Sequence, residues 1–159
     1  MKESLNKYKK LFANLQVKKT KGVQAPHKAI MLLTIMELYE KGIISDNIIP
    51  IEYIVADKFK DNWRTLVYNK KSFTHFSPNP WTPFWHLKND FFWFFVPNNG
   101  YTLLDLEAIQ PGQTPSVGKL RILAKHVMLE ESLYHLIKSE EYRNSLKETL
   151  LNVYINCYE

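Results

Sequence analysis

The segment 26–41 constrains the fold more than any other part of the chain, because it is apolar nearly all the way round a helix. Nine of its positions are Ala, Ile, Met, Leu or Tyr, and Thr34 interrupts its longest apolar run. A helix that lacks a polar face is buried on all sides. Pro26 suits the first position of such a helix, and Gly42 suits its end. The sequence therefore predicts one central helix with the rest of the chain packed around it.

Shorter periodic segments supply the surrounding elements. Apolar residues at helical spacing predict helices over 3–16, 51–68, 116–125, 129–138 and 140–157. We expect an edge strand within 43–49, a loop over 17–25 and irregular structure over 69–90. Two apolar runs, 91–96 and 101–104, flank Asn99-Gly100, a dipeptide typical of tight hairpins. The predicted fold class is α+β, mainly helical with a small sheet and a β-hairpin like that of a winged helix.

The single cysteine and the short apolar runs exclude several classes of protein. Among 159 residues only Cys157 is a cysteine, which excludes a disulfide framework and a cysteine-based zinc site. The longest apolar run, 29–36, is far shorter than the roughly 20 residues that span a bilayer. The first residues also lack the apolar core of a secretory signal. We expect one cytoplasmic domain over residues 1–159, with no membrane partner.

Positive charge is concentrated in the first half of the chain. Residues 1–75 hold 14 Lys and Arg against 7 Asp and Glu, whereas residues 76–159 hold 7 against 9. Basic clusters favour polyanions, because lysines that neutralise phosphates release condensed counterions. The asymmetry indicates a polyanion as a partner, most often a nucleic acid. A lysine-rich surface that simply faces water is the alternative interpretation.

Motifs for catalysis are not found in the sequence. The five histidines (His27, His75, His86, His126 and His135) are scattered, and no two have the spacing of a metal-binding pair. A Gly-rich phosphate loop and a nucleophile elbow are both missing. We expect no catalytic residue, no metal and no cofactor, hence a binding domain and not an enzyme. A small enzyme that uses His27, His75 and His86 is the alternative, although no nucleophile accompanies them.

The start of the central helix carries cations where a helix favours anions. His27 and Lys28 lie in its first turn, close to the partial positive charge of the helix N-terminus. An anion bound there would meet both side chains and free backbone N–H groups. The alternative is that His27 packs locally and Lys28 points to water. An aromatic-proline turn over 80–87 offers Pro83 either as part of the core or as the wall of a small apolar dent.

These two stretches resemble the DNA sulfur-binding domain that precedes an HNH nuclease in modification-dependent (type IV) restriction endonucleases. The likeness rests on Ala25-Pro26-His27-Lys28 and on the later run Pro83-Phe84-Trp85-His86-Leu87-Lys88-Asn89-Asp90, which is followed by an aromatic strand with Trp93. It covers most of the chain, including closing helices over 129–137 and 143–154. The resemblance implies a single DNA sulfur-binding-like domain over residues 1–159, the N-terminal part of a longer HNH endonuclease.

The resemblance also implies a function, the recognition of DNA in which sulfur replaces a non-bridging oxygen of a backbone phosphate. By motif, His27 and Lys28 would hold this phosphorothioate, while Thr82, Pro83 and His86 would line a pocket for the sulfur. Sulfur is less well hydrated than oxygen, so an apolar wall penalises it less. Neighbouring phosphates would be neutralised by exposed lysines: Lys18, Lys19, Lys21, Lys70, Lys71 and Lys88.

Three of these positions differ from the family pattern. The family has Arg after the histidine and Tyr before the proline, where this chain has Lys28 and Thr82, and His86 replaces a small residue. Two alternatives therefore stay open. One is a reader of another DNA modification, and the other is a protein-interaction module that docks a partner on the aromatic loop 73–87.

Overall fold

The structure is a computed structural model that describes residues 1–159, and its fold is α+β. The α-helices are α1 (Lys2–Ala13), α2 (His27–Glu40), α3 (Tyr53–Leu66), α4 (Trp81–His86), α5 (Leu103–Glu107), α6 (Val117–Leu123), α7 (Glu131–Lys138) and α8 (Glu140–Leu150). Shorter helical turns are η1 (Lys71–Phe73), η2 (Leu87–Asp90) and the π-helical η3 (Leu151–Ile155). The strands are β1 (Lys19–Thr20), β2 (Val23–Gln24), β3 (Ile49–Pro50), β4 (Trp93–Pro97) and β5 (Ala124–Leu129).

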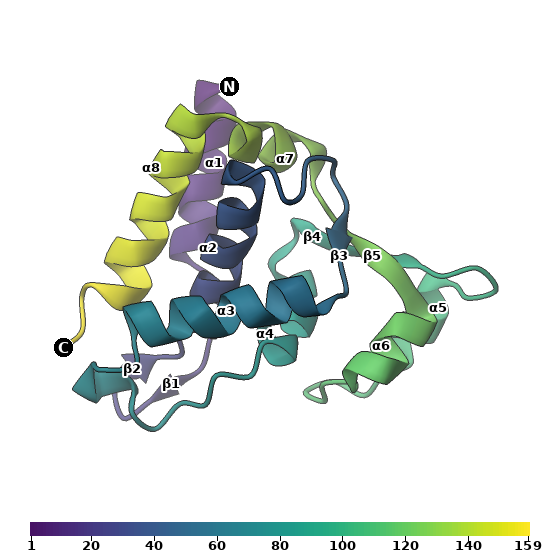
Figure 1. Ribbon diagram of the computed structural model, residues 1–159, viewed down its shortest axis with the longest axis horizontal. Coiled ribbons are helices and arrows are strands. Elements are labelled where there is room, and N and C mark those ends of the chain that lie inside the picture. Colours follow the sequence, from purple (N-terminus) through teal and green to yellow (C-terminus); the bar gives the residue numbers. More distant parts are fainter.

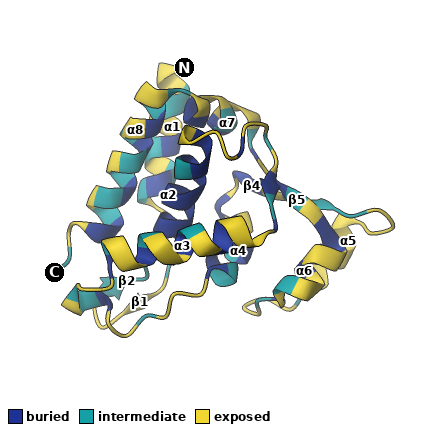
Figure 2. Cartoon of the chain, in the orientation of Figure 1, coloured by how far each residue is buried: buried dark blue, intermediate teal, exposed yellow.

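The predicted central helix is confirmed as α2, which is buried on almost every side. Eleven of its residues are buried, and it packs against α3, α4, α7 and α8. Figure 1 shows α1, α2 and α8 side by side, with α3 crossing the end of α2 where the helix begins. Figure 2 shows that α2 is mostly buried, whereas α3 turns an exposed face outward. Gly42 follows α2 with φ +69, the left-handed conformation that commonly ends a helix at glycine.

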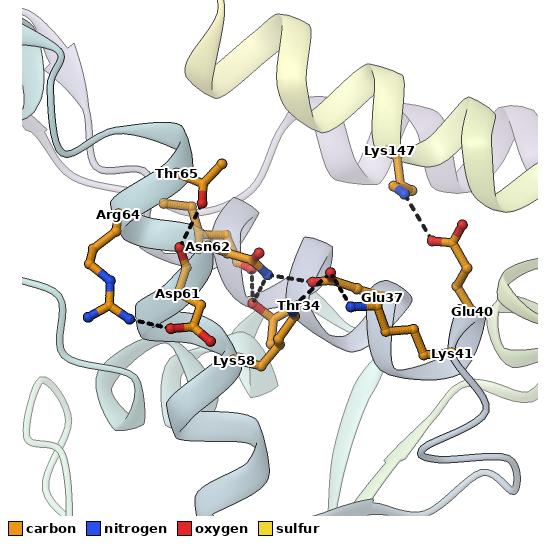
Figure 3. Close-up of polar contacts among 11 residues, drawn as sticks. Thr34, Glu37, Glu40, Lys41, Lys58, Asp61, Asn62, Arg64, Thr65 and Lys147 are labelled. Atoms are coloured by element: carbon orange, nitrogen blue, oxygen red, sulfur yellow. Dashed lines mark hydrogen bonds and ion pairs between the residues drawn. The ribbon is translucent and has the colours of Figure 1, made fainter.

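Polar contacts around Thr34 and Glu37 fix α3 on α2 (Figure 3). The amide of Asn62 donates to the hydroxyl of Thr34 and to the carboxylate of Glu37, both at 3.1 Å. Lys58 and Lys41 also lie 3.1 and 3.2 Å from Glu37. Thr34 is fully buried, and its hydroxyl donates to the carbonyl of Ile30. The polar residue that interrupts the apolar run is thus satisfied by α3.

The three-stranded antiparallel sheet has the order β3-β5-β4, so β5 is its central strand. In β4, Trp93 lies opposite Leu129 and Val96 lies opposite His126. β3 pairs with the other edge of β5 through Ile49 and Pro50, which places the predicted edge strand at the end of its segment. The predicted helices 116–125 and 129–138 leave no strand between them. This prediction is wrong over 124–129, because these residues form the central strand of the sheet.

The prediction of a hairpin over 91–104 is also wrong. The turn at Asn99-Gly100 forms, with the N–H of Tyr101 donating to the carbonyl of Asn98 at 3.0 Å, but it leads into α5. A capping box explains this, since the N–H of Thr102 donates to the Asp105 carboxylate at 2.7 Å. Such a box satisfies free donors at a helix start. With no wing hairpin here, the expected winged-helix likeness loses its basis.

Two segments that lack predicted regular structure contain short elements. The expected loop 17–25 holds the antiparallel pair β1–β2, closed by Lys21 (φ 54) and Gly22 (φ 78). Consecutive positive φ values are typical of the tight hairpin turn that matches strand twist. The expected irregular stretch 69–90 holds η1, α4 and η2. No helix in the structure combines the length and the apolar character that crossing a membrane requires.

Candidate functional site

One cavity of about 560 Å³ is lined by all five residues that the resemblance assigns to the modified phosphate. His27 and Lys28 come from the start of α2, and Thr82, Pro83 and His86 come from α4. α2 and α4 pack against each other, which brings these two distant parts of the sequence together. The cavity is completed by Gln16, Val17, Lys18 and Thr20 near β1 and by Gly112 and Thr114 in the loop before α6.

The α4–η2 segment separates this cavity from a second one. Thr82, His86 and Asn89 lie three and four residues apart and share one face of the helical segment. Trp85 and Lys88 belong to the opposite face and line a cavity of about 450 Å³ beside β4 and α5. The expected turn over 80–87 is therefore a helix, and its helical period sorts its residues between the two cavities.

Buried aromatic residues anchor α4 to the sheet. The indole N–H of Trp93 donates to the carbonyl of Phe84 at 2.9 Å, and the two rings lie 5.3 Å apart. Leu87 is fully buried as well. These contacts involve residues from the motif that carries the resemblance. The motif thus fixes the wall from which Thr82, Pro83 and His86 reach the cavity.

His27 lies in the cavity wall as a neutral imidazole at pH 7. Burial lowers the pKa of His27, and its hydrogen bond with the Ser77 carbonyl opposes this shift only in part. Its Nε2 is 2.7 Å from that carbonyl oxygen, so Nε2 carries the proton and donates it. Its ring lies 4.8 Å from Trp63 and 5.8 Å from Phe76. His27 is therefore held in place but contributes no charge.

Lys28 is buried, does not point to water and has partners within the chain. Its ammonium donates to the Asp90 carboxylate at 2.5 Å and to the Gln16 carbonyl at 2.7 Å. The side chains of Lys28 and Asp90 are only 9% and 4% exposed. The alternative that Lys28 points to water is therefore wrong, because Asp90 compensates its charge from within the chain.

His86 is the third titratable side chain in the wall. Its Nε2 lies 3.1 Å from the hydroxyl of Thr114, which links α4 to the loop before α6. Burial lowers the pKa of His86, and the positive charges of Lys28, Lys88 and Lys18 lower it further. His86 is therefore also neutral at pH 7. Its ring lines the cavity on that side.

The lysines expected on the DNA backbone fall into two groups. Five are exposed: Lys18, Lys19, Lys21, Lys71 and Lys88. Lys88 lies over the Trp85 ring, on the far side of α4–η2 from the cavity. Lys70 is different, because its ammonium donates to the carbonyls of Ile155 and Tyr158, both at 3.0 Å. The ammonium of Lys70 thus has partners within the chain, at the end of the last helix and just beyond it.

The aromatic loop 73–87 does not offer an aromatic surface. Phe73, Phe84 and Trp85 are buried in the core, while Phe76 and Trp81 are partly buried and packed against it. The alternative that this loop docks a protein partner therefore finds no exposed aromatic cluster there. No group of three or more His, Cys, Asp and Glu side chains lies close enough together to hold a metal ion.

Sequence reasoning missed several polar groups of the site. Asp90 belongs to the motif but received no role, and Gln16, Ser77 and Thr114 were not singled out. Each acts through a contact between segments that are far apart in the chain, such as the Thr114 hydroxyl with His86. The only signal for Asp90 in the sequence is its position as the acid that ends the motif. No protein-family model matches the chain, and no curated protein matches it.

Proposed function

We propose that this domain binds double-stranded DNA and reads a phosphorothioate in its backbone. In this role the domain recognises modified DNA for a restriction endonuclease and catalyses no reaction itself. In this proposal the cavity between α2 and α4 receives the modified phosphate, and exposed lysines around it receive the neighbouring phosphates.

One observation carries the proposal: the motif residues of two distant segments line the same cavity. His27 and Lys28 form one side, and Thr82, Pro83 and His86 form the other. No side chain caps the start of α2, so the first backbone N–H groups of the helix remain available as donors beside the cavity. Backbone donors and an apolar proline in the same cavity suit a group that has both anionic oxygen and weakly hydrated sulfur.

The surface beside the cavity adds a sequence-independent attraction. Lys18 lines the cavity, and Lys19 and Lys21 lie on the β1–β2 hairpin that extends from it. All three are exposed, and none makes an ion pair within the chain. Free lysines of this kind neutralise phosphates without reading bases. The hairpin is thus suited to hold DNA against the cavity.

Binding to two duplexes of the same sequence tests the proposal. One duplex carries phosphorothioates throughout one strand, so that the sequence context of the modification need not be known, and the other carries ordinary phosphates. We expect tighter binding of the modified duplex. Thr82→Glu places a carboxylate in the cavity wall and should weaken that binding by at least about tenfold, since like charges repel strongly near a surface.

A matched control adds the same charge elsewhere. Thr65 is an exposed threonine on α3, outside the cavity, and Thr65→Glu should change the affinities only slightly. Equal losses for Thr82→Glu and Thr65→Glu would contradict the assignment of the cavity. Equal affinity of the wild type for both duplexes would remove the sulfur part of the proposal and leave DNA binding. Failure to bind either duplex at low salt would remove the whole proposal.

A further inference from the structure

Asp90 is a buried acid beside a cavity that we propose to receive an anion. A negative charge there opposes phosphate binding unless it serves another purpose. Its two carboxylate oxygens have separate partners, one the ammonium of Lys28 at 2.5 Å and the other the N–H of Gln16 at 2.8 Å. Lys28 in turn donates to the carbonyl of Gln16 at 2.7 Å. The three residues thus form a closed set of contacts.

These contacts join three segments that wall the cavity. Gln16 follows α1, Lys28 belongs to the first turn of α2, and Asp90 ends η2. Gln16 and Lys28 themselves line the cavity, and so does Asn89, the neighbour of Asp90. The side chain of Gln16 also donates to the carbonyl of Asn89 at 2.9 Å. Asp90 therefore holds the positive charge of Lys28 in a fixed, compensated position within the wall.

The two histidines of the wall are uncharged at pH 7. Burial holds the pKa of His27 and that of His86 below their usual value, and neighbouring lysines lower the pKa of His86 further. With Lys28 paired to Asp90, Lys18 at the rim is the one cavity-lining cation without an internal acid. The interior of the cavity thus presents donors and apolar groups but almost no free charge.

A cavity with almost no free charge is better suited to distinguishing phosphorothioate from ordinary phosphate than to attracting phosphates in general. Ordinary phosphate and phosphorothioate carry the same net charge, but oxygen is smaller and a better hydrogen-bond acceptor than sulfur, so a free ammonium in the cavity stabilises ordinary phosphate more and lowers the selectivity. Ordinary phosphates vastly outnumber modified ones in DNA, so a free cation would fill the cavity with the wrong group. We propose that Asp90 is a specificity-determining residue, which neutralises Lys28 so that ordinary phosphate gains little from entering the cavity. This inference rests on the proposed function.

Asp90→Asn tests the inference, because it frees the charge of Lys28 while keeping the size of the side chain. We expect the affinity for the ordinary duplex to rise by about fivefold or more, while the modified duplex gains less, so that the ratio of the two affinities falls. A residue that merely maintains the fold would lose binding to both duplexes. Asp90→Glu, which keeps the charge, should retain more of the ratio than Asp90→Asn.

Asp57→Asn is the matched control. Asp57 is an exposed acid on α3 outside the cavity, and it makes no ion pair. Its removal changes the net charge by the same amount and should raise both affinities slightly and equally. A parallel change in both affinities with Asp90→Asn, in a variant that melts cooperatively, would overturn the inference while leaving the proposed function in place.

The wild type offers a second test that does not depend on the folding of a variant. On acidification from about pH 7.5, His27 and His86 gain charge as the pH falls through their lowered pKa values. The charged groups that face them are Lys18, Lys28, Lys88 and the carboxylate of Asp90. We expect the ratio of modified to ordinary affinity to fall by about threefold or more on acidification. A ratio that stays constant or rises would overturn the requirement for an uncharged cavity. Wild-type binding to neither duplex would instead remove the proposed function.

Discussion

At the scale of single residues, Lys28 differs most from its sequence-based interpretation. A cation in the first turn of a helix opposes the helix dipole, so the sequence predicts that Lys28→Ala leaves stability unchanged or slightly improved. In the structure the same substitution leaves Asp90 buried without its ammonium partner. The sign of the expected effect on stability is therefore reversed.

We expect Lys28→Ala to lower the free energy of unfolding by about 3–5 kcal/mol, the usual cost of removing one partner of a buried ion pair. Urea denaturation followed by circular dichroism measures this change. Lys19→Ala is the control, because Lys19 is exposed and makes no ion pair, and it should change stability by less than about 0.5 kcal/mol. Equal stabilities of the two variants would show that Asp90 tolerates the loss of Lys28.

The partly buried histidines predict a loss of stability in acid. Burial holds the pKa values of His27, His86 and His126 below the value of 6.5 that they approach in an unfolded chain. As the pH falls through 6.5, the unfolded chain binds protons that the folded chain does not, so the free energy of unfolding decreases. Melting temperatures between about pH 7.5 and about pH 5.5 measure this effect. Replacing His27 with Phe should make the decrease shallower, and a rise in stability on acidification would contradict the prediction.

At the scale of elements, helices with strong apolar periodicity were predictable and short elements were not. The stripe over 140–157 appears as α8 and η3, with Leu146, Leu150 and Tyr154 buried. β5 was hidden because its partners β3 and β4 are distant in sequence, and such pairing leaves little local signal. The capping residues of α5 outweighed the hairpin signal of the preceding Asn-Gly turn.

Lys70 and Lys71 separate a structural lysine from a surface lysine within one segment. We expect Lys70→Ala to lower the free energy of unfolding by about 1 kcal/mol or more, because two carbonyls at the end of the last helix lose a charged donor. Lys71→Ala should instead leave the melting temperature unchanged and lower the affinities for both duplexes slightly. Thermal melting and DNA titration of the two variants make the comparison. A larger loss of stability for Lys71→Ala would contradict both assignments.

At the scale of the whole molecule, the excess of positive charge predicts how DNA binding depends on salt. Five of the lysines named for the backbone are exposed: Lys18, Lys19, Lys21, Lys71 and Lys88. If each neutralises one phosphate, the logarithm of the affinity should fall against the logarithm of the salt concentration with a slope of about −4.5. Titrations between about 50 and about 200 mM salt measure it, and a slope near zero would contradict an electrostatic mode of binding.

Across the whole molecule, the sequence defines which residues form the candidate site better than it defines their protonation and pairing. The five motif residues line one cavity. The sequence indicated them in two separate stretches, the start of the central helix and the aromatic-proline run. What the sequence could not provide is the state of those residues. The neutral form of His27 depends on Ser77, and the compensation of Lys28 depends on Asp90, contacts that exist only after distant segments have packed.

The position of Trp63 gives the molecule an optical signal of its own. Its indole ring is buried in the core and lies 4.8 Å from the imidazole of His27, which is itself in the cavity wall. Indole emission depends on the electric field at the ring, and a proton gained by His27 places a full charge within that distance. An anion bound in the cavity changes the field at the ring as well. Ligands can therefore be followed through intrinsic fluorescence, without a dye attached to either the protein or the DNA.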